Sequence, residues 1–245
     1  MQNLRIFEYG KDYYDFAEGQ VILIDKPLRW TSFDVVNKVR YLLSRYMKVK
    51  RLKVGHAGTL DPLASGLLIV CTGQYTKLID QIQATEKEYI ATFKLGKTTP
   101  SFDLETEVDS TCDCSHITIE QVKKALDEFI GEQDQIPPMF SAKKVDGQRA
   151  YEAARQNKEI ELKPSRITIT EVELINSQLP MVTARIRCSK GTYIRSIARD
   201  LGQKLGCGAT LYELRRTTSG NFLVNNAVDV LEFEKFIKNL PPIMA

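Results

Sequence analysis

The sequence predicts an α+β fold in which a mixed, mainly antiparallel sheet is flanked by helices. Apolar runs of strand length alternate with capped segments of helical periodicity, without the steady rhythm of a doubly wound sheet. The 245 residues suit one large domain or two small ones. Because no linker is evident, we expect one contiguous body: an N-terminal extension (1–19), a main domain (20–224) and a C-terminal tail or helix (225–245).

Strands are expected where apolar residues run together or alternate with polar ones. Gln20–Asp25 is a buried-strand run that Lys26-Pro27 ends, and a final strand through Asn221–Val224 is expected to close the core. The other expected strands are 66–72, 87–95, 167–175 and 182–188.

Helices are expected where capping residues precede apolar positions of helical spacing. Thr31 or Ser32 can cap the first helix, and Thr118 with Gln121 forms a capping box for a helix that stops at Gly131. The remaining expected helices are 149–156, 193–205 and 232–240, and Phe140–Gln148 is expected as a long basic loop.

Composition excludes several classes of protein. Hydrophobic residues make up 43% and charged residues 27%, and 34 basic against 31 acidic residues give a net charge of +3, so binding of nucleic acid would need local clustering. No apolar run is long enough for a membrane span, and the N-terminus lacks the apolar core of a signal peptide. We expect a cytoplasmic protein, and we also expect it to be a monomer.

The five cysteines are odd in number, which fits reduced thiols in a cytoplasm. Cys112, Cys114 and His116 form a C-x-C with a nearby histidine, a pattern that can ligate a metal ion. No second ligand pair follows it, so plain surface thiols are favoured and no metal site is expected.

One interval concentrates positive charge. Val35–Leu60 holds seven Lys or Arg and no acid: Lys38, Arg40, Arg45, Lys48, Lys50, Arg51 and Lys53. A solvated helix face would explain this pattern, but 26 residues without an acid favour a phosphate-binding patch.

Asp61 stands out in the Gly-rich turn Gly55–Pro62, at the start of an apolar strand. Pro62 disfavours helical geometry at Asp61, and the glycines allow another backbone to approach closely. Such an Asp is usually structural. A lone Asp among basic and aromatic residues suits a nucleophile better than a member of an acid/base pair.

A second concentration is Cys188–Ser196, where Arg187, Lys190, Arg195 and Arg199 surround the expected start of a helix. Its backbone N–H groups could hold a phosphate. A well-capped helix with a basic solvated face explains the pattern equally well.

Five ordered segments resemble the TruB-type tRNA pseudouridine synthases, over about residues 20 to 220. One of them, GHAGTLDPLASGLLIVCTGQYTKL, resembles the motif that carries the family's catalytic aspartate. The others are LIDKP (23–27), EKEYIATFKLGKTT (86–99), IPPMFSAKKVDGQRAYEAAR (136–155) and CSKGTYIRSIARDLGQKLGCGATLYELRRT (188–217). The resemblance implies the pseudouridine synthase fold and makes 20–224 the catalytic domain.

The resemblance also implies residue roles. Asp61 matches the catalytic aspartate, Arg195 the arginine that pairs with it, and Tyr89 the tyrosine that stacks on the target uracil and is a candidate base. His56 matches the histidine that fills the space of the flipped nucleotide. The remaining matches are Leu214 as an apolar pocket wall, Lys26 and Pro27 beside the pocket, Tyr193 as its neighbour, Lys190 as an RNA contact, and 140–148 as the insertion that folds over RNA.

The implied reaction isomerises uridine at position 55 of the tRNA T-loop to pseudouridine and needs no cofactor. The implied partner is the T-arm stem-loop. Only about 25 residues follow Gly220, too few for the PUA-type RNA-binding domain that many relatives carry. Three questions stay open: whether Asp61 attacks ribose C1′ or uracil C6 or promotes elimination, whether the substrate is instead ribosomal RNA, and whether the chain only binds or folds RNA.

Overall fold

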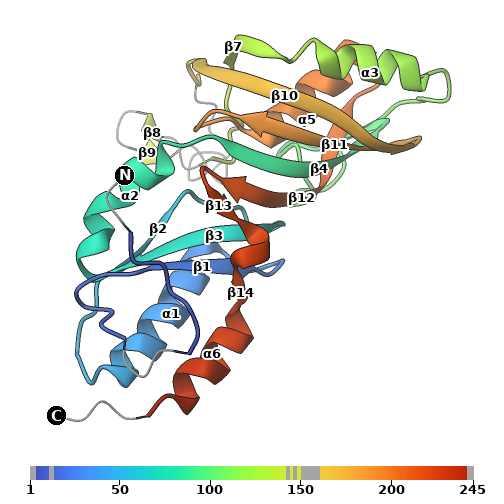
Figure 1. Cartoon of the computed structure of the whole chain (residues 1–245). Coiled ribbons are helices and arrows are strands. Elements are labelled where there is room, and N and C mark those ends of the chain that lie inside the picture. Colours follow the sequence, from blue (N-terminus) through green and yellow to red (C-terminus); the bar gives the residue numbers. More distant parts are fainter. Residues whose placement is uncertain (1–3, 11–13, 142–143, 146–147, 150–160, 242–245) are drawn as a thin grey trace. The chain divides into compact units, whose positions relative to one another are not determined.

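The computed structural model describes residues 4–10, 14–141, 144–145, 148–149 and 161–241. The chain divides into two compact units (Figure 1). The first unit comprises Met1–Lys87 and Arg215–Ala245, and the second comprises Glu88–Leu214.

The helices and strands have these bounds. The helices are α1 (Ser32–Tyr46), α2 (Ile79–Gln83), α3 (Ile119–Asp127), α5 (Ile194–Leu205) and α6 (Val230–Asn239), with 3-10 turns η1 (Gly73–Leu78) and η2 (Val224–Asn226). The strands are β1 (Val21–Lys26), β2 (Val54–Ala57), β3 (Ala64–Thr72), β4 (Lys87–Leu95), β5 (Lys97–Thr98), β6 (Ser110–Thr111), β7 (Gly131–Gln135), β8 (Lys144–Val145), β9 (Gln148–Arg149), β10 (Ser165–Gln178), β11 (Met181–Cys188), β12 (Ala209–Ser219), β13 (Phe222–Leu223) and β14 (Val228–Asp229).

The predicted α+β class with a mixed, mainly antiparallel sheet is confirmed. In the first unit, β1 pairs in parallel with β14 and antiparallel with β3, and β2 also pairs antiparallel with β3. In the second unit, β10 pairs antiparallel with both β11 and β7. The residues of β12 are divided between the two units.

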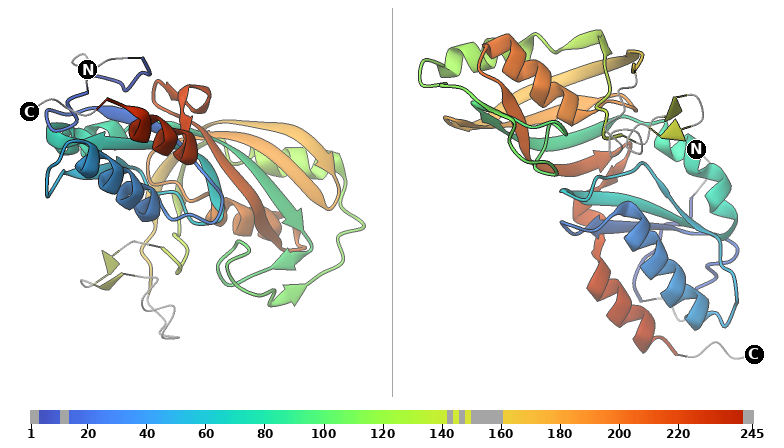
Figure 2. Two further views of the ribbon diagram at one scale, coloured as in Figure 1. Left: turned by 90° about the horizontal axis from the view of Figure 1, so that it is seen from below. Right: turned by 180° about the vertical axis from the view of Figure 1, so that it is seen from behind.

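The alternation of side chains along β1 and β3 explains the two layers of the first unit. Ile22 and Ile24 of β1, with Leu68 and Val70 of β3, face the core formed with α1 and α6, and these two helices lie side by side (Figure 2). The intervening residues, among them Leu23 and Ile69, pack with Ile82 of α2 on the opposite face. A sheet buried on both faces reads as a continuous apolar run, as observed here.

Residues of the predicted N-terminal extension join this core. Phe7, Tyr14 and Phe16 are buried, and the Phe7 ring lies 5.4 Å from that of Phe233 in α6. Ile6 forms a parallel bridge with Val21 of β1. The expected packing role of residues 1–19 therefore has a concrete form in the described residues among them.

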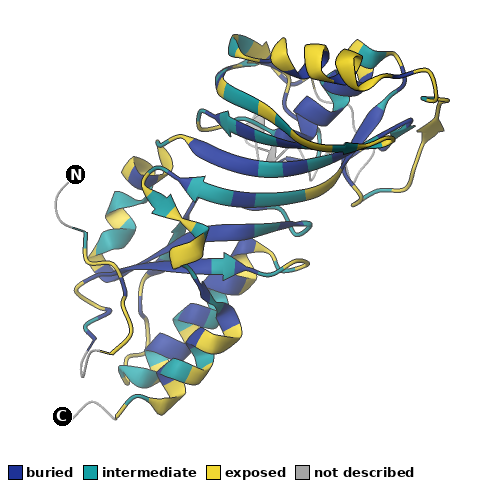
Figure 3. Cartoon of the chain, turned by 45° about the vertical axis from the view of Figure 1, so that its right-hand side comes forward, coloured by how far each residue is buried: buried dark blue, intermediate teal, exposed yellow. Residues whose placement is uncertain are grey.

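In the second unit, α3 packs against α5 and β10. Figure 3 shows buried residues along the strands and exposed residues on the outer face of α3. The predicted capping box of Thr118 with Gln121 is confirmed at the start of α3, and the predicted N-cap Thr31 is confirmed at the start of α1, where it forms a capping box with Asp34. Gly206 ends α5 at φ 69°, in the left-handed region that favours glycine.

Three predicted elements need correction. The long strand β12 is absent from the prediction, and the expected closing strand over 221–224 is only the two-residue β13, which pairs with the end of β12. Within 140–148, expected as a loop, Lys144–Val145 pairs with Gln148–Arg149 as a small hairpin. Arg149, expected as the first residue of a helix, is thus a strand residue, and the rest of 149–156 lies outside the described residues. Among the described residues, no helix is long and apolar enough to span a membrane.

Candidate active site

Asp61 lies in the segment that connects β2 to β3 in the first unit. Its side chain is partly exposed, and its backbone carbonyl accepts a hydrogen bond of 3.0 Å from the N–H of Ala64. The next residue, Pro62, accepts at its carbonyl from the N–H of Arg29 at 2.7 Å. These backbone contacts fix the turn locally and leave the Asp61 side chain at the start of a buried strand.

Lys26 and Pro27 follow β1. Lys26 is fully buried, and its ammonium donates to the carbonyls of Pro27 and Trp30 at 3.0 and 2.6 Å. Burial lowers the pKa of Lys26 to about 8, while the charge of Asp61 opposes that shift and Arg216 adds to it. Lys26 therefore stabilises the turn that follows β1 and contributes positive charge to the surroundings of Asp61.

His56 lies on β2, and its Nδ1 is buried with no hydrogen-bond partner in the described part of the chain. Burial lowers the pKa of His56, and the nearby cation of Arg216 lowers it further. The imidazole is therefore neutral at physiological pH, which suits a side chain that fills apolar space left by a base.

Arg195 lies in the first turn of α5 and is only 4% exposed. Its guanidinium forms an ion pair with Asp103, with Nε 3.6 Å from Oδ2, and Nη2 donates to the Phe140 carbonyl at 2.9 Å. Asp103 in turn accepts from the Ser101 hydroxyl at 2.6 Å. A buried guanidinium with several fixed partners is a rigid group, so its orientation is set before any substrate arrives.

The start of α5 is held by Gln135 of β7. The Gln135 amide accepts from the Tyr193 N–H at 2.8 Å and donates to the Tyr193 carbonyl at 3.1 Å, so it satisfies both backbone groups of this residue. Tyr89 of β4 is 8% exposed, Leu214 of β12 is half-buried, and Lys190 is exposed. These predicted site residues all belong to the second unit, as Arg195 does.

The structure thus places the predicted residues in two groups. Asp61, His56, Lys26 and Pro27 belong to the first unit, and Lys26 is electrostatically coupled to Asp61. Arg195 belongs to the second unit, and its pairing with Asp61 stays a prediction.

The expected basic cluster around the start of α5 is largely neutralised. Arg187 pairs with Glu88 at 2.8 Å, Arg199 pairs with Asp200 at 2.7 Å, and Arg195 pairs with Asp103. The sequence showed the four cations, but it did not show that Glu88 and Asp103 are brought to them from other segments. A phosphate-holding surface is therefore weaker here than their spacing suggested.

The basic interval 35–60 differs in this respect. Lys38 pairs with Glu234 of α6 at 2.6 Å, but the other six cations form no ion pair with a carboxylate among the described residues. Three of them, Arg40, Arg45 and Lys50, line a hollow of about 360 Å³ at the C-terminal end of α1. We call these residues, with Tyr41 and Ser44, the α1 groove.

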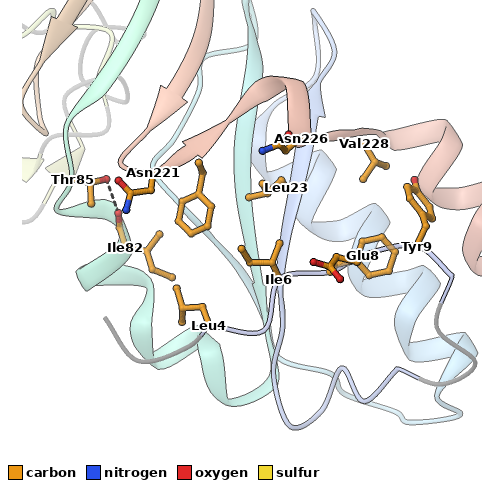
Figure 4. Close-up of a pocket in the computed structure, with 12 residues that line it drawn as sticks. Leu4, Ile6, Glu8, Tyr9, Leu23, Ile82, Thr85, Asn221, Asn226 and Val228 are labelled. Carbon is orange, nitrogen blue, oxygen red and sulfur yellow. Dashed lines mark hydrogen bonds between the residues drawn. The ribbon is translucent and has the colours of Figure 1, made fainter.

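A larger pocket of about 680 Å³ lies elsewhere in the first unit (Figure 4). Its walls are mostly apolar and come from the N-terminal segment, β1, α2 and the chain around β13, with Leu4, Ile6, Leu23 and Ile82 among them. None of the site residues predicted from the sequence lines it. It therefore adds nothing to the chemistry of Asp61.

Sequence reasoning missed two residues that touch the Asp61 segment, Arg216 and Ser32. Arg216 is 1% exposed and donates to the Leu67 and Gly58 carbonyls, and Ser32 is hydrogen-bonded to Leu60. No signal in the sequence pointed to Arg216, because its strand β12 was not predicted and a charged residue normally suggests exposure to solvent. Among the described residues, no group of three or more His, Cys, Asp or Glu side chains could hold a metal ion.

Two family models match consecutive parts of the chain. Residues 44–194 match the TruB family pseudouridylate synthase (N terminal domain), and residues 195–239 match the tRNA pseudouridylate synthase B C-terminal domain. The chain is 54% identical over 224 residues to tRNA pseudouridine synthase B of Parabacteroides distasonis, covering 91% of this chain and 95% of that one. It is 50% identical to the protein of that name from Flavobacterium johnsoniae, covering 91% and 98%.

Solved structures agree with the fold. The crystal structure of a Cbf5-Nop10-Gar1 complex contains a chain that matches with a TM-score of 0.68 and 27% identity. The match covers 90% of this chain and 54% of that one. The structure of an H/ACA RNP bound to a substrate RNA containing 2′-deoxyuridine matches with a TM-score of 0.65 and 26% identity, covering 90% and 53%.

Proposed function

Because the chain belongs to the TruB family of pseudouridylate synthases and isomerises uridine in tRNA, we propose that its target is position 55 in the T-loop and that Asp61 is its nucleophile. The observation that carries the proposal is the placement of Asp61. It lies in a turn whose backbone is hydrogen-bonded on several sides, at the start of β3, and it is coupled to the buried Lys26. A carboxylate held in a fixed backbone geometry suits a nucleophile.

Arg195 is proposed to pair with Asp61 and orient it. Its guanidinium already contacts Asp103 and two backbone carbonyls, Ser101 and Phe140, so its position is determined by the second unit. A guanidinium can grip a carboxylate with two parallel hydrogen bonds, which an ammonium cannot do. This pairing would hold the nucleophile in the geometry that attack requires.

The remaining roles concern the target base. Tyr89 is proposed to stack on the uracil and to serve as a base for the C5 proton, and Leu214 to form an apolar wall. Neutral His56 is proposed to occupy the space that the flipped nucleotide leaves, which would offset part of the few kcal/mol that unstacking costs. Lys190, Tyr193, Lys26 and Pro27 would border the pocket.

The reaction needs these groups and no redox chemistry. The bond between N1 and ribose C1′ breaks, the uracil turns, and C5 bonds to C1′. The C5 proton is lost to solvent and N1 takes up a proton, so the product is an isomer of the substrate. Nothing is oxidised or reduced, so atoms and electrons balance without a cofactor. Whether the carboxylate adds to the ribose or to the base, or promotes elimination, does not change which residues are involved.

The proposed partner is the T-arm stem-loop, bound by a cytoplasmic monomer whose catalytic domain spans 20–224. Relatives more than 50% identical to the chain carry the name tRNA pseudouridine synthase B, which favours tRNA over ribosomal RNA and an enzyme over a module that only binds or folds RNA. For phosphates, the α1 groove supplies three cations, Arg40, Arg45 and Lys50, that pair with no carboxylate in the described parts of the chain.

The test uses unmodified tRNA transcribed in vitro and the full chain. Pseudouridine should form at position 55 and stop at about one per tRNA, and a transcript with cytidine at position 55 should remain unmodified. Pseudouridine at another tRNA position, with position 55 left as uridine, would contradict the proposed target.

A further inference from the structure

The segment that carries Asp61, Gly58–Leu67, is held by side chains from two other elements of the first unit. Arg216 reaches it from β12, and Ser32 reaches it from the first turn of α1. Both side chains are buried, at 1% and 2% exposure. Neither belongs to the groups expected to touch the target base.

Arg216 contacts both ends of the segment. Its Nη2 donates to the Gly58 carbonyl at 3.0 Å, and its Nε donates to the Leu67 carbonyl at 2.8 Å. A buried cation is costly unless its donors are satisfied, and the rigid fork of a guanidinium can serve two carbonyls at once. An ammonium on a flexible stem cannot fix both ends in the same way.

Two glycines make this close approach possible. A Cβ atom at Gly58 would lie 3.3 Å from Nη1 of Arg216, and a Cβ atom at Gly66 would lie 2.3 Å from the backbone oxygen of Arg216. Both glycines also have positive φ, 96° and 100°. Gly58 and Gly66, which have no Cβ atom, therefore leave the room that Arg216 needs beside the segment that carries Asp61.

Ser32 holds the residue next to Asp61. Its hydroxyl donates to the Leu60 carbonyl at 2.9 Å and accepts from the Leu60 N–H at 2.8 Å. One side chain thus satisfies both backbone groups of Leu60, as a strand neighbour would. Arg216 and Ser32 together restrain Gly58, Leu60 and Leu67, on either side of Asp61.

We propose that Arg216 and Ser32 are positioning residues that fix the Gly58–Leu67 backbone and thereby aim the Asp61 carboxylate at the reacting nucleotide. The inference rests on the proposed role of Asp61 as nucleophile. A nucleophile displaced by about 1 Å can lose two orders of magnitude in rate while the substrate still binds. The expected signature is therefore a loss of turnover without a loss of tRNA affinity.

The test compares Arg216→Lys and Ser32→Ala, each with a matched control. Arg215→Lys makes the same change one residue earlier on β12, at a half-exposed side chain paired with Asp25. Thr31→Ala removes the N-cap of α1, next to Ser32, without touching Leu60. Thermal unfolding confirms that each variant is folded.

Two quantities are measured on unmodified tRNA: the single-turnover rate at saturating enzyme, followed by release of tritium from C5 of the uridines, and the Kd for tRNA. Arg216→Lys and Ser32→Ala should lower the rate at least about tenfold and change the Kd less than about threefold. Both controls should stay within about threefold of the parent chain in rate and Kd.

Rates for Arg216→Lys and Ser32→Ala that equal those of their controls would overturn the proposal. An equal loss of rate in Thr31→Ala and Ser32→Ala would also overturn it, because general destabilisation of α1 would then explain both. If Arg216→Lys does not fold, the comparison of the single-turnover rates of Ser32→Ala and Thr31→Ala tests the proposal. The variant Asp61→Asn, measured in parallel, separates the proposed function from the positioning role. If Asp61→Asn is active, Asp61 is not the nucleophile. If Asp61→Asn is inactive while Arg216→Lys and Ser32→Ala are active, only the positioning role is refuted.

Discussion

Buried cations dominate the surroundings of the proposed nucleophile. Lys26 and Arg216 are almost completely removed from solvent, and both donate to backbone carbonyls. The glycines of its turn and the proline that follows identified Asp61 as unusual in the sequence, and the family resemblance supplied its role. They could not identify Arg216 or Asp103, because a charged residue reads as exposed until the fold shows which partners meet it.

The buried Lys26 should make the free energy of unfolding depend on pH. Burial lowers its pKa from 10.5 to about 8 in the folded chain, so between these pH values the unfolded chain binds more protons. Stability should therefore rise with pH over this interval, and below pH 8 the cost of the buried charge should be constant.

Comparison with Lys26→Met isolates this contribution from other titrating groups. Between pH 7.5 and 9.5, the free energy of unfolding of the parent chain should increase by about 2 kcal/mol relative to Lys26→Met. Urea unfolding at the two pH values measures it, and a difference that does not change with pH would show that Lys26 titrates normally.

Arg195→Lys should reduce turnover severely and spare RNA binding. The charge is kept, but the planar fork that contacts Asp103 and two carbonyls is lost, and with it the proposed two-point grip on Asp61. We expect a fall in single-turnover rate of about a hundredfold or more with a Kd within a few-fold. A normal rate in a folded Arg195→Lys variant would limit Arg195 to packing within the second unit.

The elements of the structure follow the sequence where the pattern is local. The start of α1, the start of α3 and the end of α5 carry capping signals that the structure confirms. β12 was missed because its middle, YELRR, shows no clear apolar alternation, and its buried Arg216 is compensated by carbonyls from β3 and the preceding segment. A strand of this kind depends on tertiary partners that no local pattern records.

The cations of the α1 groove should contribute to the salt dependence of tRNA binding. Arg45 and Lys50 pair with no carboxylate among the described residues, whereas Lys38 on the same helix pairs with Glu234. The double variant Arg45→Gln/Lys50→Gln should reduce the slope of log K against log salt for tRNA binding by about 1.5, the value for two lost phosphate contacts.

Lys38→Gln is the matched control and should leave the salt slope unchanged. Titrations of tRNA at several salt concentrations measure both variants. Equal slopes for the double variant and the parent chain would show that the α1 groove does not bind RNA phosphates.

The whole molecule consists of two units, and the proposed catalytic residues are divided between them. The sequence predicted the α+β class and most strands, but not this division, because no linker marks it and the chain re-enters the first unit within β12. Contacts between distant segments define such units, and they leave little trace in composition.

The distribution of charge over the chain predicts which part of the tRNA contributes to kcat/KM. Within the described part of the chain, the cations around 187–199 are mostly paired with acids and those of 40–53 form no ion pair, so phosphate contacts should concentrate around 40–53. We expect an isolated T-arm stem-loop to be modified nearly as efficiently as whole tRNA. In measurements of kcat/KM at one salt concentration, an advantage of whole tRNA above roughly a hundredfold, about 2.7 kcal/mol, would mean that contacts beyond the T-arm contribute.

Pseudouridine mapping with Asp61→Asn and with the parent chain is the decisive test of whether Asp61 is the nucleophile for isomerisation at position 55. Asparagine keeps the volume of the side chain and removes the charge that attack requires. We expect pseudouridine at position 55 with the parent chain, none above background with Asp61→Asn, and similar tRNA affinity for both. Pseudouridine at position 55 formed by Asp61→Asn at a rate near that of the parent chain would contradict this role of Asp61.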